Sequence, residues 1–554
     1  MLHPLTVPSG LQLRQLLPEA HVLGSSELLV RRFVRDARQV RPGDVWVVVP
    51  KPPKHLRPKA KSRKSYGLSA SSPPISSKDL SLAVARGASA VVLQPPLNED
   101  LPIPVVLVPD VREAWGRICH ALAGHPTKIL RVIAVTGRLG TTATCWLLKQ
   151  VLAQAGYRPG LVSRLGCFDG THWKPAESHP PTPEVLATQL AQMVRAQCTH
   201  AVVEVHLAGL AQKALAGMEL HGVCLTPIGR GGGTRCRLAS AESPAEHSPE
   251  GNLPPGPSVC NSQPWAPPAW LTALKTGLFP YLKPEGLSVL SVDDPASAAF
   301  LPCLEGPVLT VGQRQMGEIT ARLLEADLAE QTFLLQAGAD LVPVRTRPIG
   351  REHITSCLLA AAVGLAYGID LLQIVRALEA VETIPGQLER IVRGQPFAVF
   401  LQPAHSALEL QACLPTLRRR CQGRLWCVAG LPRQKKKAHW FRQVLPRYVD
   451  RLLLTVEEPG DHSSLSQTHP AAKPILEAFA PPKQASWIPD RGDAIFSALQ
   501  QAQPGDCVLV LTRLPTTHPP IGNDLPGNEL PLGDDRAVVQ ACLAHLYPEE
   551  LPLS

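Results

Sequence analysis

The sequence predicts an α/β protein built from three domains. Three observations support this prediction: the length of the chain, the alternation of apolar strands with helical segments, and a strand that runs into a glycine turn and a helix at residues 132–144. A chain of 554 residues, of which 45% are hydrophobic, is too long for one core and fits about three domains. We place the domains at residues 1–126, 127–384 and 385–554.

The first domain is expected to be a small α/β unit that ends at the joint Pro126-Thr127. The turn Pro42-Gly43 introduces its first apolar strand. Short apolar runs and helical segments then alternate along the chain. We expect strands at 45–49, 90–93 and 105–108, and helices at 83–87 and 111–124.

Two short stretches are strongly basic. Residues 51–64 hold seven basic side chains, three prolines and no acidic residue, and residues 433–437 read Arg-Gln-Lys-Lys-Lys. No aromatic residue is interleaved with the charges of 51–64, so nothing there would stack on bases. The net charge of +9 is modest for this length. We therefore interpret both stretches as solvated loops and do not expect a nucleic-acid partner; a contact with nucleic acid or acidic lipid is the alternative.

Composition also bears on compartment and metal chemistry. We find neither a basic start followed by an apolar segment nor a run of 18 or more apolar residues, which predicts a cytoplasmic protein without membrane insertion. The 14 cysteines are scattered, with no Cys-x-x-Cys pair or Cys/His cluster at metal spacing. We expect them to be reduced.

Residues 132–144 form the central motif of the chain. A buried strand, a glycine turn and a helix N-terminus together present free backbone N–H groups and the positive end of a helix dipole, which suits phosphate. In a P-loop a lysine follows the second glycine, and a Ser or Thr after it binds Mg²⁺. Here the glycines are Gly137 and Gly140 and the hydroxyl is Thr142, but Thr141 occupies the lysine position.

The rest of the second domain continues the alternation and predicts a mostly parallel sheet that is covered on both faces. Glu204 lies near the carboxyl end of its strand, the edge where such sheets bind ligands, although a strand-end salt bridge explains its position equally well. We expect helices at 141–155, 184–197, 357–367 and 371–381, strands at 160–162, 201–205 and 288–292, a flexible insertion at 229–268, and a helical segment at 270–279 that carries Lys275.

The third domain shows the same alternation of apolar strands and helices, which predicts a second covered sheet. We expect strands at 398–401, 425–429, 451–455 and 507–511, and helices at 407–419 and 492–501.

Together these motifs resemble those of the Mur ligases, most closely the UDP-N-acetylmuramoyl-tripeptide synthetases, which add the third amino acid to the peptidoglycan precursor. Residues 132–144 resemble the family's Val-Thr-Gly-Thr-Asn-Gly-Lys-Thr-Thr, and Glu204-Val205 resembles the start of its metal-binding Glu-Val-Ser-Ser-His. Further matches, in chain order, are Asp36-Ala37-Arg38 with Pro42-Gly43-Asp44, Thr182-Pro183, Lys275, Asp293-Asp294-Pro295, Gly350-Arg351, Pro385-Gly386, Glu389-Arg390, Ala404-His405, Asp490-Arg491 and Asp535.

The resemblance implies the three-domain Mur ligase architecture, with a P-loop-like central domain and a Rossmann-like C-terminal domain. It implies ATP and Mg²⁺ as cofactors, a UDP-linked muropeptide precursor as the ligand, and other cell-wall enzymes as candidate partners. By resemblance, the phosphates would contact Gly137, Arg138, Gly140, Thr141 and Thr142; the metal would contact Thr142, Glu204 and a carbamylated Lys275; catalysis would use Lys275, Glu204 and His405; and the substrate would contact Asp36, Arg38 and Thr182.

The departures from the family pattern fall on the chemistry. Thr141 stands for the loop lysine, and His206-Leu207-Ala208 stands for the Ser-Ser-His after the metal-binding glutamate. The other departures are His353 and Ser356 for two asparagines, Gln387 for the arginine of Pro-Gly-Arg, Gln402-Pro403 for Asp-Tyr, Glu457-Glu458-Pro459-Gly460 for Asp-Asn-Pro-Arg, and residues 512–516 for Gly-Lys-Gly-His-Glu. Contacts to a transferring phosphoryl group are commonly worth about 10²-fold or more each in rate.

These losses predict a Mur-ligase-like protein whose ligase activity is lost or strongly reduced. Arg138, in the same loop, is a candidate for the missing charge, although its planar group would approach from a different place. Two alternatives remain. One is an active ligase with a changed substrate, in which Glu457 and Glu458 favour a cationic amino acid; the other is a scaffold that binds a nucleotide or muropeptide without turnover.

Overall fold

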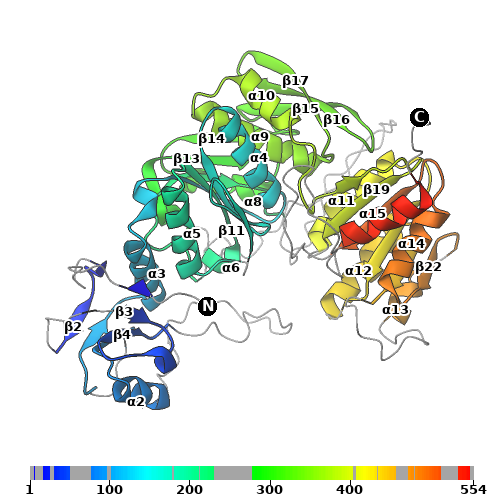
Figure 1. Cartoon of the computed structure of the whole chain (residues 1–554). Helices are drawn as coiled ribbons and strands as arrows, with labels where there is room; N and C mark the ends of the chain where they lie inside the picture. The colour runs from blue at the N-terminus through cyan, green and yellow to red at the C-terminus, as the bar shows by residue number, and fades with distance from the viewer. Residues whose placement is uncertain are drawn as a thin grey trace, which may run out of the picture.

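The computed structural model shows three α/β units, each built on its own sheet (Figure 1). The first and third units lie at opposite ends and the second lies between them. None of the described helices has both the length and the apolar character needed to cross a membrane. The structure describes residues 5–6, 16–24, 30, 32–49, 77–95, 101–176, 180–210, 212–229, 277–403, 407–432, 435–456, 472–479, 481–512 and 535–548.

The first unit has a sheet with parallel strands in the middle and an antiparallel strand at each edge. The strand order is β1 (Leu5–Thr6), β3 (Arg32–Val34), β4 (Asp44–Val47), β5 (Ala90–Leu93), β6 (Val105–Leu107) and β2 (His21–Leu23), with helices α2 (Ser77–Ala85) and α3 (Val111–Leu122). The helix expected at 83–87 begins six residues earlier, because the exposed polar residues of its first turns hide the apolar pattern.

His120 of α3 is fully buried, and neither of its ring nitrogens has a hydrogen-bond partner among the described residues. Burial, with a smaller contribution from His125, lowers the pKa of His120 from 6.5 to about 4. Below pH 6.5 the unfolded chain therefore binds a proton that the folded chain does not accept until about pH 4. The contribution of His120 to stability is thus lost progressively as the pH falls from 6.5 toward 4.

Replacing His120 with leucine is expected to flatten the pH dependence of stability. Between pH 7.5 and pH 5, the free energy of unfolding of the first unit should fall by about 2 kcal/mol less in the variant than in the wild type, because one pKa unit corresponds to about 1.4 kcal/mol. Urea unfolding at both pH values measures this difference. The exposed His21→Gln variant is the control; an unchanged pH dependence in His120→Leu would refute the prediction.

A buried carboxylate connects the first unit to the second. Glu184, in helix α5 (Pro183–Arg195), accepts a hydrogen bond from the Trp115 indole at 2.8 Å and forms an ion pair of 2.5 Å with Arg35. Burial raises the pKa of Glu184, but the charge of Arg35 and the hydrogen bonds outweigh it, so the pKa lies below its ordinary value. Glu184 is therefore ionised at neutral pH and holds α3 against α5.

The second unit is built on a long mixed sheet whose strands from β8 to β15 are parallel, with antiparallel strands at both ends. The strand order is β10 (Trp173–Pro175), β9 (Gly166–Phe168), β8 (Pro159–Ser163), β11 (His200–Val205), β7 (Arg131–Thr136), β12 (Leu220–Leu225), β13 (Leu282–Ser291), β14 (Val308–Gly312), β15 (Ile319–Ala326), β16 (Gln331–Ala337) and β17 (Asp340–Thr346). Its helices, besides α5, are α4 (Thr141–Gln154), α6 (Leu207–Leu210), α8 (Pro295–Ala298), α9 (Arg351–Ala366) and α10 (Leu371–Glu379).

Apolar side chains of β7 alternate between two cores, which confirms the predicted coverage of both faces. Ile133 and Val135 lie in the core formed with α4, α9 and α10. Val132 and Ala134 lie in the core formed with α5 on the opposite face. The covered parallel strands therefore bring the loops after β7, β8 and β11 to one edge of the sheet.

Several elements of this unit were not predicted. The strands β14 to β17 were not predicted from the sequence, because β15 and β17 are largely exposed and their alternation of apolar residues is weak. Helix α9 begins at Arg351, not at Cys357, because its first turns bury polar side chains, including His353 and Ser356.

The third unit is a second doubly covered sheet, as predicted, with β18 antiparallel and the other strands parallel. Helices α11 and α12 cover one face, and α14 and α15 cover the other. The strand order is β18 (Glu389–Ile391), β19 (Ala398–Pro403), β23 (Cys507–Thr512), β20 (Leu425–Gly430), β21 (Arg451–Thr455) and β22 (Gln484–Trp487), with helices α11 (Ala407–Arg420), α12 (Lys435–Tyr448), α13 (Lys473–Leu476), α14 (Arg491–Gln501) and α15 (Asp535–Leu546).

The interpretation of residues 433–437 as a loop was wrong for its last three residues, because α12 begins at Lys435. In the sequence, the charges at the start of α12 and Pro446 near its end do not predict a helix. The buried side chains of Phe441 and Leu445 secure it against the third sheet. The other basic stretch, 51–64, lies outside the described residues, and the domain boundaries after residues 126 and 384 stay predictions.

Candidate functional site

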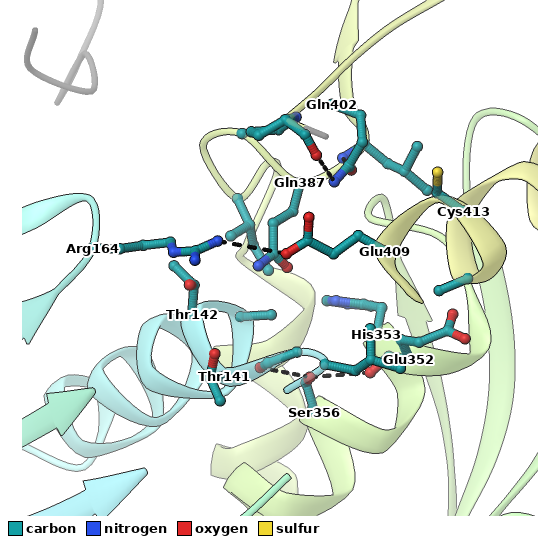
Figure 2. A pocket seen from close by; sticks show the side chains of 18 of the residues that line it. Thr141, Thr142, Arg164, Glu352, His353, Ser356, Gln387, Gln402, Glu409 and Cys413 are labelled. Carbon is teal, nitrogen blue, oxygen red and sulfur yellow. Dashed lines mark hydrogen bonds and ion pairs between the residues drawn. The ribbon is translucent and has the colours of Figure 1, made fainter. Parts of the chain in front are cut away.

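A cavity of about 600 Å³ lies between the second and third units. Its size is typical of small-molecule sites. One wall is the loop after β7 with the start of α4, and the ends of β8 and β11 continue it. The start of α9 adds to this wall, and residues 384–388, the end of β19 and helix α11 form the opposite side (Figure 2).

Two glycines shape the loop between β7 and α4. Gly137 has φ +148°, and a β-carbon there would overlap the Thr226 hydroxyl oxygen and lie 2.5 Å from the Thr226 carbonyl oxygen. Gly140 has φ +75°, and its β-carbon would lie 2.7 Å from Ser356 Oγ. Both positions therefore need glycine, because the loop lies directly against neighbouring chain.

The loop offers part of its backbone to a ligand. The N–H groups of Arg138 and Leu139 both donate to the Pro227 carbonyl at 3.1 Å, so the protein already satisfies them. The helical ladder of α4 begins with the N–H of Thr144, which donates to the Gly140 carbonyl at 2.8 Å. The N–H groups of Thr141, Thr142 and Ala143 precede that bond and lie at the positive end of the helix dipole. This end of α4 is the part of the wall suited to an anion.

Glu204 is part of this wall, lies at the end of β11, and is 5% exposed. Its Oε1 accepts hydrogen bonds from the hydroxyls of Thr141 at 3.0 Å and Thr142 at 2.9 Å. Its Oε2 accepts from the backbone N–H of Arg164 at 2.9 Å. The carboxylate thus holds the start of α4 against the end of β8, and the structure brings the predicted residues Thr141, Thr142 and Glu204 together.

The described lining holds more negative than positive side chains. Its carboxylates are Glu204, Glu352 and Glu409, and its guanidinium groups are Arg138 and Arg164. Burial raises the pKa of Glu352, which reduces its charge relative to an exposed glutamate.

His353, which lines the cavity, adds little positive charge to it at neutral pH. Burial lowers the pKa of His353 to about 4. Its ring Nε2 lies 3.4 Å from Cys357 Sγ. A polyphosphate would therefore enter a site with few cations, and a divalent cation would reduce the repulsion.

The oxygen atoms around Glu204 fit Mg²⁺. Thr142 Oγ1 and Glu204 Oε1 lie 2.9 Å apart, and Mg²⁺ prefers one or two carboxylates completed by waters and phosphate oxygens. No group of three or more His, Cys, Asp or Glu side chains in the described ranges is arranged to hold a metal ion. The residues present therefore suit an ion that shares its ligands with a nucleotide.

Three predicted substrate contacts, Asp36, Arg38 and Thr182, are not among the described residues that line this cavity. Asp36 and Arg38 are exposed in the first unit, where the Asp36 carboxylate accepts the Arg38 N–H at 3.0 Å. Thr182 directly precedes α5 and is two residues from Glu184. Outside the described residues lie Lys275, His405, Glu457, Glu458 and residues 230–268 of the expected insertion.

Three charged residues of the described lining were missed: Arg164, Glu352 and Glu409. Arg164 directly follows β8, and its Nη1 lies 3.8 Å from Oε1 of Glu409 on α11. The position of Arg164 after an apolar run at the carboxyl edge of a parallel sheet was a usable indication. Glu409 offers none, since its partner lies 245 residues away in another unit.

Comparisons with known proteins agree with this architecture. A family model described as "Mur ligase, glutamate ligase domain" matches residues 387–513. A UDP-N-acetylmuramoyl-L-alanyl-D-glutamate–2,6-diaminopimelate ligase of Geobacillus kaustophilus (strain HTA426) is 30% identical over 468 residues, which cover 83% of this chain and 88% of that protein.

Solved structures share the fold. A UDP-N-acetylmuramoyl-L-alanyl-D-glutamate–2,6-diaminopimelate ligase superposes with a TM-score of 0.61 at 19% identity, covering 97% of this chain and 99% of that one. A Mycobacterium tuberculosis folylpolyglutamate synthase complexed with ADP and AMPPCP superposes with a TM-score of 0.52 at 16% identity. The superposition covers 78% of this chain and 94% of that one.

Three α/β units with a glycine loop facing the third unit define a three-domain architecture of the ligase type. The extent of the match to the Geobacillus protein identifies the group within that class: the chain belongs to the Mur ligase family.

Proposed function

We propose that the chain binds ATP with Mg²⁺ in the cavity between the second and third units, and that its ligase activity is lost or strongly reduced. The observation that carries this proposal is the contrast between two adjacent residues. Thr142 keeps a hydroxyl beside Glu204, as a magnesium site requires. Thr141 supplies a second hydroxyl to the same carboxylate where a phosphate-binding loop has a lysine.

Nucleotide binding is supported by the start of α4 and by the oxygen pair of Thr142 and Glu204. In this proposal the loop from Gly137 to Thr141 surrounds the phosphates, and Thr142 and Glu204 hold Mg²⁺. When bound, Mg²⁺ would neutralise charge on the phosphate oxygens. The start of α4 would orient the phosphate chain with its N–H groups, and the units on either side would exclude water.

Weak turnover is supported by the charge of the cavity. A ligase of this family phosphorylates a carboxylate and then releases phosphate as an amine attacks, so negative charge accumulates on the transferring group. The hydroxyl of Thr141 cannot provide a cation, and the described lining holds three carboxylates against two guanidinium groups. Each missing contact commonly costs about 10²-fold in rate.

The substrate class follows from the relatives. The Geobacillus protein is named for ligation of UDP-N-acetylmuramoyl-L-alanyl-D-glutamate and 2,6-diaminopimelate, and we propose that any substrate retained here is of the same UDP-linked kind. Asp36, Arg38 and Thr182 stay proposed substrate contacts, and Lys275 and His405 stay proposed catalytic residues.

Calorimetry with ATP and Mg²⁺ tests the binding part of the proposal. We expect measurable binding by the wild type and about tenfold tighter binding by Thr141→Lys, because a charged hydrogen bond to phosphate is worth about 1.5–3 kcal/mol. Thr141→Val is the matched control: it removes the same hydroxyl without adding charge, and its affinity should not rise. Absence of binding by the wild type would refute this part.

Phosphate release with UDP-N-acetylmuramoyl-dipeptide and diaminopimelate tests the turnover part. We expect a rate at least about 10²-fold below that of the Geobacillus relative measured in parallel, because at least one contact to the transferring group is missing. Comparable rates for the two proteins would refute the reduced activity.

A further inference from the structure

We infer that Arg164 is the residue that contacts the phosphate chain in this cavity, in the role that the loop residue Thr141 cannot fill, and that Glu409 holds it when no anion is bound. This inference rests on the proposed nucleotide binding. It assigns the positive charge to a different strand end from the one that carries the glycine loop.

The backbone of Arg164 is fixed beside the glycine loop. Strand β8 runs parallel to β11, with Val162 opposite Val203, so Arg164 leaves the sheet at the edge where Glu204 lies. The two oxygens of Glu204 accept from the Arg164 N–H at 2.9 Å and from the Thr141 hydroxyl at 3.0 Å. One carboxylate therefore holds Arg164 next to the position from which the lysine is missing.

The side chain of Arg164 extends into the cavity above Thr142 and toward Glu409 (Figure 2). An arginine side chain ends in a planar group with five N–H donors, which matches the oxygens of a phosphate. Arg164 lines the same cavity as Thr141 and Thr142 in the first turn of α4, whose backbone N–H groups precede the first helical hydrogen bond. Backbone donors and a cation would thus contact the same anion from two sides.

The guanidinium group of Arg164 is only weakly bound to Glu409. Its Nη1 lies 3.8 Å from Glu409 Oε1, which exceeds hydrogen-bond distance, and its side chain is 24% exposed. Its Nε has no hydrogen-bond partner among the described residues. A partly exposed ion pair of this length contributes little, so a phosphate that offers direct hydrogen bonds would displace Glu409.

Because Glu409 lies on α11, this exchange would occur across the cavity. The ion pair joins the end of β8 in the second unit to the start of α11 in the third. A bound phosphate would then break the ion pair between Arg164 and Glu409. Glu409 and the phosphate would thus compete for the same guanidinium group. Removing the Glu409 carboxylate should therefore strengthen anion binding.

Arg138 is the matched comparison. It carries the same charge and lines the same cavity, but its side chain is exposed and its backbone N–H is held by Pro227 at 3.1 Å. In the sequence, the position of Arg138 in the loop makes it the candidate for the phosphate contact. In the structure, the contacts around Glu204 favour Arg164 for that contact. The two variants Arg164→Met and Arg138→Met remove equal charge and distinguish the two candidates.

Calorimetry with ATP and Mg²⁺ on the full chain tests the inference. We expect Arg164→Met to weaken binding by about tenfold or more, since charged hydrogen bonds are the strong ones, and Arg138→Met to change it less than about threefold. Arg164→Lys should recover part of the affinity, and adding Thr141→Lys to Arg164→Met should recover most of it. Glu409→Gln should bind about twofold to fivefold more tightly than the wild type.

The outcomes separate the inference from the proposed function. Binding by the wild type that Arg164→Met leaves unchanged, or that Arg138→Met weakens equally, would overturn the inference alone. Absence of binding by the wild type would overturn both. Thermal unfolding without nucleotide shows whether Arg164→Met is folded; if it is not, an unchanged affinity of Glu409→Gln would overturn the inference, and tighter binding would support it.

Discussion

Replacing Glu204 with glutamine is expected to weaken Mg²⁺-dependent ATP binding by about 100-fold or more. The variant keeps the size of the side chain but removes the negative charge from the proposed metal site. Its amide oxygen can still accept the Arg164 N–H, and its N–H₂ can donate to the hydroxyls of Thr141 and Thr142, which accept as well as donate. The start of α4 therefore keeps its partner, and the loss falls on the metal.

The measurement is ATP affinity as a function of Mg²⁺ concentration. In the wild type the affinity should rise with Mg²⁺, and in Glu204→Gln it should depend only weakly on it. Glu409→Gln is the matched control for the Mg²⁺ dependence, since it removes a carboxylate of the same cavity without touching the oxygen pair. Its affinity should be somewhat higher than that of the wild type but should rise with Mg²⁺ in the same way. An unchanged Mg²⁺ dependence in Glu204→Gln would show that the metal binds elsewhere.

Replacing Gly137 with alanine should destabilise the second unit by about 3 kcal/mol. The added β-carbon would overlap the Thr226 hydroxyl oxygen and lie 2.5 Å from the Thr226 carbonyl oxygen, and φ of +148° is unfavourable for alanine. The loop would have to move away from Thr226, whose N–H donates to the Thr136 carbonyl at 2.8 Å. ATP binding should be lost with the shape of the loop.

The Gly156→Ala variant separates the cost of the positive φ from the cost of the contact with Thr226. Gly156 also has positive φ, +85°, but a β-carbon there meets no atom within 4 Å. This variant should therefore show only the backbone cost, about 1 kcal/mol. Urea unfolding compares the variants; equal losses would mean that the contact with Thr226 does not constrain the loop.

The part of the site that is visible in the sequence is the part with local patterns. The apolar run before Gly137, the second glycine at Gly140 and the hydroxyl of Thr142 occupy one continuous segment, so local chain geometry is enough to predict the turn. Glu204 follows another apolar run, and parallel strands bring such ends to one edge. In the structure the Thr142 hydroxyl donates to Glu204 at 2.9 Å.

Elements with mixed exposure were harder to predict. Helix α12 begins with three lysines, and only the buried contacts of residues such as Phe441 explain its stability. The start of α9 buries Ser356, whose hydroxyl donates to the Gly140 carbonyl at 3.3 Å. The burial of such a polar side chain depends on a partner that is distant in sequence, so no periodic pattern in the sequence predicts it.

The sequence by itself determined the three α/β units, the glycine loop and the absence of its lysine, because strand alternation, positive-φ glycines and residue identity are local properties of the chain. The tertiary structure alone decided that Arg164, and not only Arg138, faces the cavity, and that Glu409 lies opposite it. The physical reason is that charge in a cavity depends on which side chains converge in space, and sheet order together with the packing of the third unit against the second sets that convergence.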